Sequence, residues 1–183
     1  EEAMRIQRVL NADIAMVFDE CTPYPADEGQ ARKSMQLSLR WAERSKRAHE
    51  SNRNALFGIV QGGMHEHLRE EALRGLVDIG FDGYAIGGLS VGEPKPTMYA
   101  MIEALEPPLP PRLPRDLMGV GYPDDLRAAI GRGLTNGALA YWTGRPQAEK
   151  QARPIEDDTN DLTRSSSPIR NPFLRGATAP FLE

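Results

Sequence analysis

Two adjacent carboxylates near the start of the chain follow an apolar run and precede a proline-rich turn. They are Asp19 and Glu20, in the segment VFDECTPYPAD at residues 17–27. Folds of the α/β type place ligand-reading groups at the carboxyl ends of buried strands. A carboxylate there can accept two parallel N–H bonds, such as those of N1–H and the 2-amino group of guanine. The segment therefore indicates a site for a planar, hydrogen-bonding heterocycle.

Three further apolar runs end in groups that suit the same ligand: Gln61-Gly62-Gly63, Gly87-Gly88-Leu89 and Met118-Gly119. A glutamine amide or a bare glycine N–H can donate to a ring carbonyl, and a methionine thioether can lie against a ring face. Taken singly, each has a plainer explanation, because such carboxylates often cap helices and glycine pairs usually mark turns. The prediction of a site depends on all four segments meeting at one edge.

Two other patterns do not predict a cofactor. In His65-Glu66-His67 the histidines are two residues apart, so on a helix they point to different sides, and Arg69 stands where H-E-x-x-H needs its second histidine. The glycines of residues 87–93 match neither a dinucleotide fingerprint nor a P-loop. The single cysteine, Cys21, excludes an internal disulfide and a multi-cysteine zinc site within this chain.

Strand and helix patterns alternate through the first 133 residues. Strands are expected at residues 13–19, 55–60, 83–86 and 116–120, and helices at residues 1–12 and 29–50, around 68–79 and 98–105, and from Pro123 onward. About four βα units predict a parallel sheet, which is either half of a (β/α)₈ barrel or a small open sheet. Half a barrel would leave bare strand edges that favour pairing with another chain.

The remaining residues, 134–183, are expected to form a divergent, irregular tail. Periodicity is lost beyond residue 133, and residues 144–183 are rich in Pro, Arg, Asp, Thr and Ser. Residue 1 opens inside a predicted helix and is not methionine, so we expect a piece of a longer protein.

Charge and hydropathy limit the choice of partners. The formal net charge of −4 gives no overall attraction to nucleic acid, so a nucleic-acid partner needs a local basic face. The expected helix at residues 29–50 has such a side, with Arg40, Arg44, Lys46 and Arg47. No apolar run is long enough to cross a bilayer, and no signal peptide is recognisable, so we expect a cytoplasmic protein without a membrane partner.

Four motifs in series resemble the tRNA-guanine transglycosylases, also called queuine tRNA-ribosyltransferases, over about residues 1–133: FDECTPYPAD (18–27), GIVQGG (58–63), YAIGGLSVGE (84–93) and LMGVGYPDDL (117–126). The resemblance implies a (β/α)₈ barrel with a structural zinc site. It also implies exchange of the wobble guanine of tRNA for queuine or a 7-deazaguanine precursor, through an aspartate nucleophile and a covalent glycosyl–enzyme intermediate. The implied partners are tRNA, the base, and a second subunit in a homo- or heterodimer.

Matched positions carry the family's base-recognition roles into this chain. The resemblance implies that Asp19 reads the guanine-like edge and that Cys21 lines the same pocket. It implies that Gln61 and the N–H of Gly88, which follows Gly87, contact the base carbonyl.

The other side of the implied pocket comes from the third and fourth motifs. The carbonyl of Leu89 would accept from a 7-aminomethyl group, with Glu93 supporting that peptide from behind. Met118 and Gly119 would form one wall against the base. Ser90 and the intact run from 89 to 93 favour a bacterial-type enzyme.

The family's catalytic groups do not match, and no catalytic residue is identified in this chain. The nucleophile motif Asp-Met-Phe-Asp-Cys is replaced by RGLTNGALA at residues 132–140. A direct alignment puts Ala138 at the nucleophile position; alternatively a block is deleted, and residues 136–144 match the strand pair that follows the family's basic RNA-binding loop. The zinc ligands are absent, and the proton-transfer aspartate would precede residue 1.

Three hypotheses follow. The chain is part of a transglycosylase that keeps the base pocket but lacks the chemistry, or it is a non-catalytic subunit that pairs with a complete transglycosylase and helps to hold tRNA. The third is a carbohydrate- or nucleoside-processing domain that uses Asp19 and Glu20 as an acid–base pair. Adjacent strand residues face opposite sides, which disfavours the third hypothesis.

Overall fold

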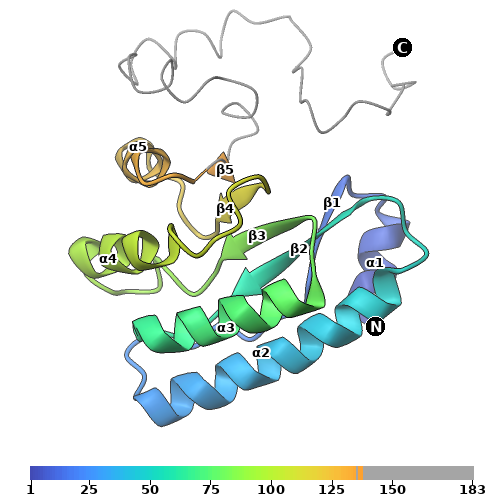
Figure 1. Cartoon of the computed structure of the whole chain (residues 1–183), viewed down its shortest axis with the longest axis horizontal. Helices are drawn as coiled ribbons and strands as arrows, with labels where there is room; N and C mark the ends of the chain where they lie inside the picture. Colours follow the sequence, from blue (N-terminus) through green and yellow to red (C-terminus); the bar gives the residue numbers. More distant parts are fainter. Residues whose placement is uncertain (135, 138–183) are drawn as a thin grey trace, which may run out of the picture. The chain divides into compact units, whose positions relative to one another are not determined.

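The computed structural model describes residues 1–134 and 136–137, which form a parallel α/β arrangement (Figure 1). The elements are α1 (Glu2–Val9), β1 (Ile14–Met16), α2 (Glu28–His49), β2 (Ala55–Val60), α3 (Glu66–Ile79), β3 (Gly83–Ile86), α4 (Lys95–Leu105), β4 (Arg115–Leu117), α5 (Pro123–Gly131) and β5 (Asn136–Gly137). They belong to one compact unit. The predicted irregular tail lies outside the described residues, apart from residues 134, 136 and 137.

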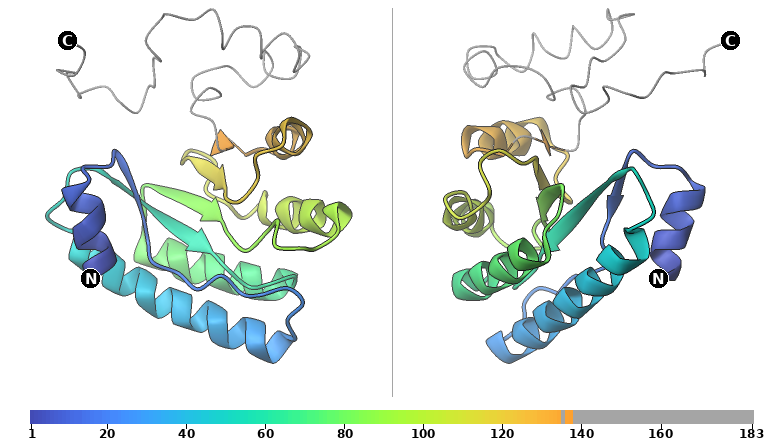
Figure 2. Two further views of the ribbon diagram at one scale, coloured as in Figure 1. Left: turned by 180° about the vertical axis from the view of Figure 1, so that it is seen from behind. Right: turned by 45° about the vertical axis from the view of Figure 1, so that its right-hand side comes forward.

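The sheet distinguishes between the two expected architectures. Its strand order is β1-β2-β3-β4-β5, and every neighbouring pair is parallel. A doubly wound sheet reverses its strand order at a switch point, whereas a barrel adds each strand beside the preceding one. Consecutive helices α2 to α5 also contact one another along one side of the sheet (Figures 1 and 2). This is the arrangement of an incomplete (β/α)₈ barrel.

The central strands match the prediction and the outer strands differ from it. β2 and β3 cover the predicted residues, because both are continuous buried runs. β1 ends at Met16 instead of residue 19, since the chain leaves β2 after the N–H of Val17 bonds the carbonyl of Phe57 at 3.0 Å. β5 was not among the strands expected from apolar runs, although the alternative alignment places a strand pair from residue 136 onward; its two residues pair with β4 and extend the sheet beyond residue 133.

Helix α2 buries a mixed stripe of small, apolar and hydroxyl side chains. Its first turn is capped by Asp27, whose carboxylate accepts the N–H of Gln30 at 2.8 Å. Its buried residues are Ala31, Ser34, Met35, Ser38, Ala42, Ser45 and His49. Three serines therefore occupy positions where the helical period predicts apolar residues.

None of the described helices is long and apolar enough to cross a membrane.

One buried cation joins α3 to the ends of two strands. Arg69 has no exposed surface, and its guanidinium donates to the carbonyls of Gly63 at 2.7 Å, Gly87 at 3.0 Å and Gly88 at 3.2 Å, with a longer bond of 3.4 Å to Val60. Burial lowers the pKa of Arg69 to about 10, so it remains charged at neutral pH. The Val60 carbonyl also accepts the N–H of Gly87 at 3.1 Å, whereas the carbonyls of Gly63, Gly87 and Gly88 depend on the guanidinium as a donor.

Replacing this cation should therefore destabilise the fold strongly. We expect Arg69→Met to lower the free energy of unfolding by about 3 kcal/mol, because several buried acceptors lose their donor. Denaturant unfolding followed by circular dichroism measures the effect. The control is Arg74→Met on the same helix, which removes an exposed cation 3.7 Å from Glu70 and should change stability by less than about 0.5 kcal/mol. Equal losses in the two variants would contradict the role given to Arg69.

Strand β4 carries a carboxyl into the interior of the sheet. Asp116 pairs in register with Ala85 of β3 and Asn136 of β5, and it points to the face opposite Arg115 and Leu117. Burial raises the pKa of Asp116 to about 6, partly offset by a hydrogen bond from the backbone of Leu117. The folded chain therefore holds this proton between about pH 4 and 6, where the unfolded chain has released it.

This carboxyl should make stability fall as pH rises through that window. Asp116→Asn mimics the protonated form, so we expect the variant to gain stability over the parent on the order of 2 kcal/mol between pH 4.5 and 7.5. Urea unfolding at both pH values provides the comparison. Asp78→Asn, at an exposed position of α3, should show no such pH-dependent gain. A constant difference between Asp116→Asn and the parent would show that the carboxyl is not held protonated.

Candidate functional site

The segment that follows β1 places Asp19 against the end of β2. Asp19 is half-buried, and its Oδ2 accepts a hydrogen bond of 2.6 Å from Nε2 of Gln61, the residue that follows β2. Burial raises the pKa of the Asp19 carboxyl, while the bond from Gln61 opposes this shift. Two predicted site residues 42 positions apart in the chain are thus in direct contact.

The glycine doublet after β3 packs closely on the same amide. Added Cβ atoms at Gly87 and Gly88 would lie 2.8 Å from Nε2 and 2.4 Å from Oε1 of Gln61, so a side chain at either position would displace the Gln61 amide. Gly88 also has a φ of +62°, in the left-handed region that glycine adopts readily. The Oε1 atom of Gln61 is buried and has no hydrogen-bond partner in the described part of the chain. The site therefore contains a buried polar atom that a ligand could satisfy.

The loop after β3 and the end of β4 form a second contact. An added Cβ at Gly119 would lie 3.1 Å from the carbonyl oxygen of Leu89, so the two backbones lie side by side. Glu93 accepts the N–H of Ser90, which belongs to the same peptide unit as that carbonyl, and the N–H of Val91 at 2.9 Å. The Leu89 peptide is therefore held on its N–H side, and its oxygen lies toward the end of β4.

The remaining predicted residues lie at the margins of this group. Met118 follows β4, is half-buried against the core, and donates its N–H to the carbonyl of Ile86 at 3.1 Å. Cys21 is exposed, and burial of its thiol together with the charge of Asp19 raises the thiol pKa. Cys21 lies two residues after Asp19 on the same segment.

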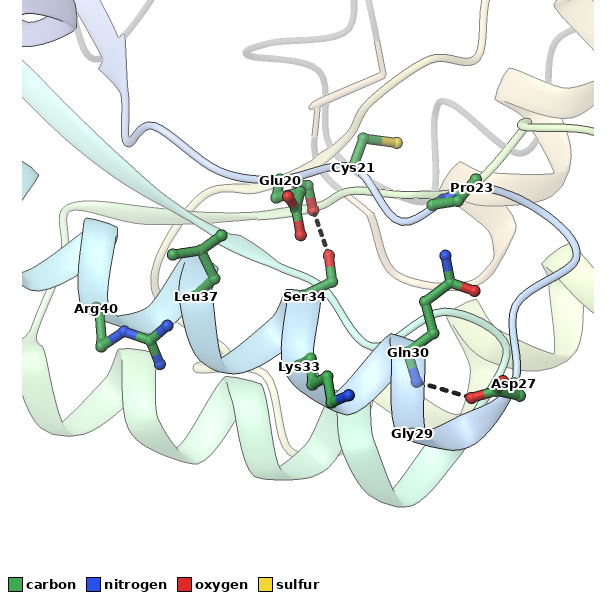
Figure 3. Close-up of a pocket in the computed structure, with 10 residues that line it drawn as sticks. All are labelled: Glu20, Cys21, Pro23, Asp27, Gly29, Gln30, Lys33, Ser34, Leu37 and Arg40. Carbon is green, nitrogen blue, oxygen red and sulfur yellow. Dashed lines mark hydrogen bonds between the residues drawn. The ribbon is translucent and has the colours of Figure 1, made fainter.

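A groove of about 630 Å³ runs between the segment after β1 and α2 (Figure 3). Of the predicted site residues, only Cys21 lines it. Its other lining residues are Glu20, Pro23, Asp27, Gly29, Gln30, Lys33, Ser34, Leu37 and Arg40. Glu20 thus lies beside α2 while Asp19 contacts β2, so the two carboxylates have different surroundings and do not form an acid–base pair.

Metal ligation receives no support from the described residues, which contain no group of three or more His, Cys, Asp or Glu side chains that could hold an ion. His67 instead contacts Glu28 at 3.0 Å. The structural zinc implied by the resemblance therefore has no fitting ligands among these residues, and no step is assigned to it.

Two positioning features were not found by sequence reasoning. In the sequence Arg69 stands out only because it breaks a metal motif, whereas in the structure it holds both glycine segments. The buried serines of α2 bond the backbone around Asp19. Their spacing within an otherwise apolar stripe was the available signal for them.

Comparison with known proteins places these features in a family. The family model described as Queuine tRNA-ribosyltransferase matches residues 1–141. Proteins of that name are 65% identical over 134 residues in Methylobacillus flagellatus, 65% over 136 residues in Nitrosospira multiformis and 64% over 134 residues in Marinobacter nauticus. Each match covers 73% of this chain but only 36–37% of the relative, so the chain spans little more than a third of their length. The chain belongs to the queuine tRNA-ribosyltransferase family.

Proposed function

We propose that this chain supplies the base-recognition part of a tRNA-guanine transglycosylase, a glycosyltransferase of queuosine biosynthesis that modifies tRNA in the cytoplasm. The observation that carries the proposal is the meeting of Asp19, Gln61 and the Gly87-Gly88 doublet at the carboxyl ends of β1, β2 and β3. The family match supports the same activity.

Recognition of the base would exchange one hydrogen bond for several. In the structure, Gln61 donates to Asp19. An incoming guanine or 7-deazaguanine would present N1–H and its 2-amino group to the carboxylate, which releases the glutamine amide for the ring carbonyl. The N–H of Gly88 is proposed as a second donor to that carbonyl. The bound ring thus replaces the internal pair with matched partners.

The edge of the base that carries the 7-substituent would lie at the contact between the Leu89 carbonyl and Gly119. The Leu89 carbonyl is proposed to accept from a 7-aminomethyl group, because Glu93 holds the N–H side of its peptide unit. Met118 and Gly119 are proposed as a wall, and Cys21 as part of the rim. This set would distinguish a 7-substituted deazaguanine from guanine through a single additional acceptor.

Catalysis would need groups that this chain does not provide. On direct alignment the nucleophile position is Ala138, which lies outside the described residues, and the family's zinc ligands are absent from the sequence. We therefore propose that the chain alone binds the base without transferring it.

A second candidate is a non-catalytic, tRNA-holding subunit of a homo- or heterodimer with a complete transglycosylase. The specific observation in its favour is the β1 side of the sheet. β1 is an edge strand, and the neighbouring α1 exposes Ile6, Val9 and Leu10 by 48%, 73% and 73%. An exposed edge beside exposed apolar side chains favours association.

Base binding should depend on the Asp19 carboxylate. We expect Asp19→Asn to weaken binding of 7-aminomethyl-7-deazaguanine about 10- to 100-fold, because a charged acceptor of two N–H groups is lost. Isothermal titration calorimetry measures the dissociation constant. The matched control is Asp27→Asn, because Asp27 lines the nearby groove and asparagine can still cap helix α2. Protonation of Asp19 removes the charged acceptor, so the parent's affinity should fall as the pH is lowered. Because the pKa of Asp19 is raised, this fall should begin at a higher pH than for an ordinary aspartate. Undiminished binding by Asp19→Asn would refute the assignment.

The lack of catalytic carboxylates should be visible in an exchange assay. Purified protein incubated with tRNA and radiolabelled guanine should incorporate no label above the protein-free level. The full-length Methylobacillus flagellatus protein serves as the positive control. Measurable exchange by this chain alone would overturn the non-catalytic assignment, and co-purification with a full-length relative would favour the subunit role.

A further inference from the structure

The segment that carries Asp19 is held on one side by a helix. After the last bond between Val17 and β2, the chain runs along α2, where it meets three buried hydroxyls. Ser34, Ser38 and Ser45 are 5%, 4% and 3% exposed. Their spacings of four and seven residues place them on one helical face. This row of serines supplies the hydrogen bonds that a neighbouring strand would otherwise provide.

The three serines bond three peptide units of the segment, and the carbonyl of Glu20 is shared by Ser34 and, at 3.5 Å, by Ser38. Oγ of Ser45 accepts the N–H of Phe18 at 3.2 Å, and Oγ of Ser38 accepts the N–H of Glu20 at 2.9 Å. Oγ of Ser34 donates to the carbonyl of Glu20 at 3.2 Å. The N–H of Glu20 belongs to the peptide unit that begins at the carbonyl carbon of Asp19. Of the bonds made by these serines, only the one that Ser38 accepts from the N–H of Glu20 fixes a peptide unit directly attached to Asp19.

The surroundings of Asp19 give the segment few other constraints. Phe18 packs on Trp41 of α2 with ring centroids 5.0 Å apart, and buried Thr22 donates to Oγ of Ser34 at 3.0 Å, so both ends of the segment are anchored. Between them Glu20 and Cys21 are exposed, so packing of their side chains adds little next to Asp19. The direction of the Asp19 carboxylate therefore depends on its backbone. With the following peptide unit held against α2, the carboxylate reaches Gln61 at 2.6 Å.

We propose that Ser38 is a positioning residue for base recognition, because its buried hydroxyl sets the direction in which Asp19 presents its carboxylate. The ligand in this inference rests on the proposed function, whereas the orientation of Asp19 does not. Loss of the hydroxyl would let the Asp19–Glu20 peptide rotate, and the carboxylate would leave the rim of the site for solvent.

The first test uses the ligand-free full chain. Ser38→Ala is compared with Ser45→Ala. The second variant loses an equally buried hydroxyl from the same helix, but that hydroxyl bonds a peptide unit not attached to Asp19. Both variants should lose similar stability. Carbon-13 NMR titration of the Asp19 carboxyl should show a raised pKa in the parent and in Ser45→Ala, and a value nearer to that of an exposed aspartate in Ser38→Ala. An unchanged titration in Ser38→Ala would overturn the inference.

The second test reads selectivity between guanine and hypoxanthine, which lacks the 2-amino group. The preference of the parent for guanine should fall about fivefold to tenfold in Ser38→Ala and remain in Ser45→Ala, since only a well-directed carboxylate discriminates the amino group. Equal selectivity in the two variants would count against the positioning role. If the parent binds neither purine, the proposed function fails, and the titration still decides whether Ser38 directs Asp19.

Discussion

A single buried guanidinium holds together the part of the sheet on which the candidate site is built. Parallel strands end with carbonyls that no longer have ladder partners, and here the chain turns sharply through glycines at two adjacent strand ends. Arg69 donates to the carbonyls of Gly63, Gly87 and Gly88, and so fixes both turns relative to α3. The glycines themselves have no side chains to pack, so their backbone is fixed by these hydrogen bonds, while the neighbouring Leu89 is held in the core. The close approach of Gln61 to Gly87 and Gly88 depends on this arrangement.

The polar groups of the site form two sets. Asp19 and the buried Gln61 bond each other and form the rim pair, and a second set of groups bonds only backbone: Arg69, Glu93 and Ser38. The rim pair satisfies Asp19 but leaves the Oε1 atom of Gln61 without a partner in the described residues. Such a rim can exchange its internal bond for bonds to a ligand at little cost, whereas the second set has no such freedom. Recognition and support are therefore carried by different residues.

The sheet has two open edges, which bear on how the chain could associate with another. The strand order places β1 and β5 at the two edges. β1 has three residues and β5 has two, so each edge offers few backbone groups for pairing. The exposed apolar residues of α1 lie beside the β1 edge. The proposed association with a second chain is therefore supported by the exposed apolar side chains of α1 more than by the short strand edges.

The local sequence pattern was sufficient to predict the bounds of the strands whose residues are almost all buried. The runs that became β2 and β3 are apolar throughout, so their bounds could be predicted, and the alternation of strands and helices indicated a parallel sheet. The end of β1 could not be predicted in the same way, because Val17, Phe18 and Asp19 continue the extended pattern while their hydrogen bonds pass from β2 to α2. The short strand β5 has no apolar run, and its existence depends on the pairing of Asn136 with Asp116.

The sequence by itself determined which residue types stand at the strand ends, since chain order in a parallel fold brings those ends to one edge. It also determined the family, through four motifs in series. Only the tertiary structure decided which of these residues touch and what holds them. The contact of Asp19 with Gln61, the four carbonyls around Arg69 and the serine hydroxyls along the Asp19 segment join residues 6 to 42 positions apart. These hydrogen bonds depend on side-chain direction and burial, which the spacing of residues along a chain does not specify.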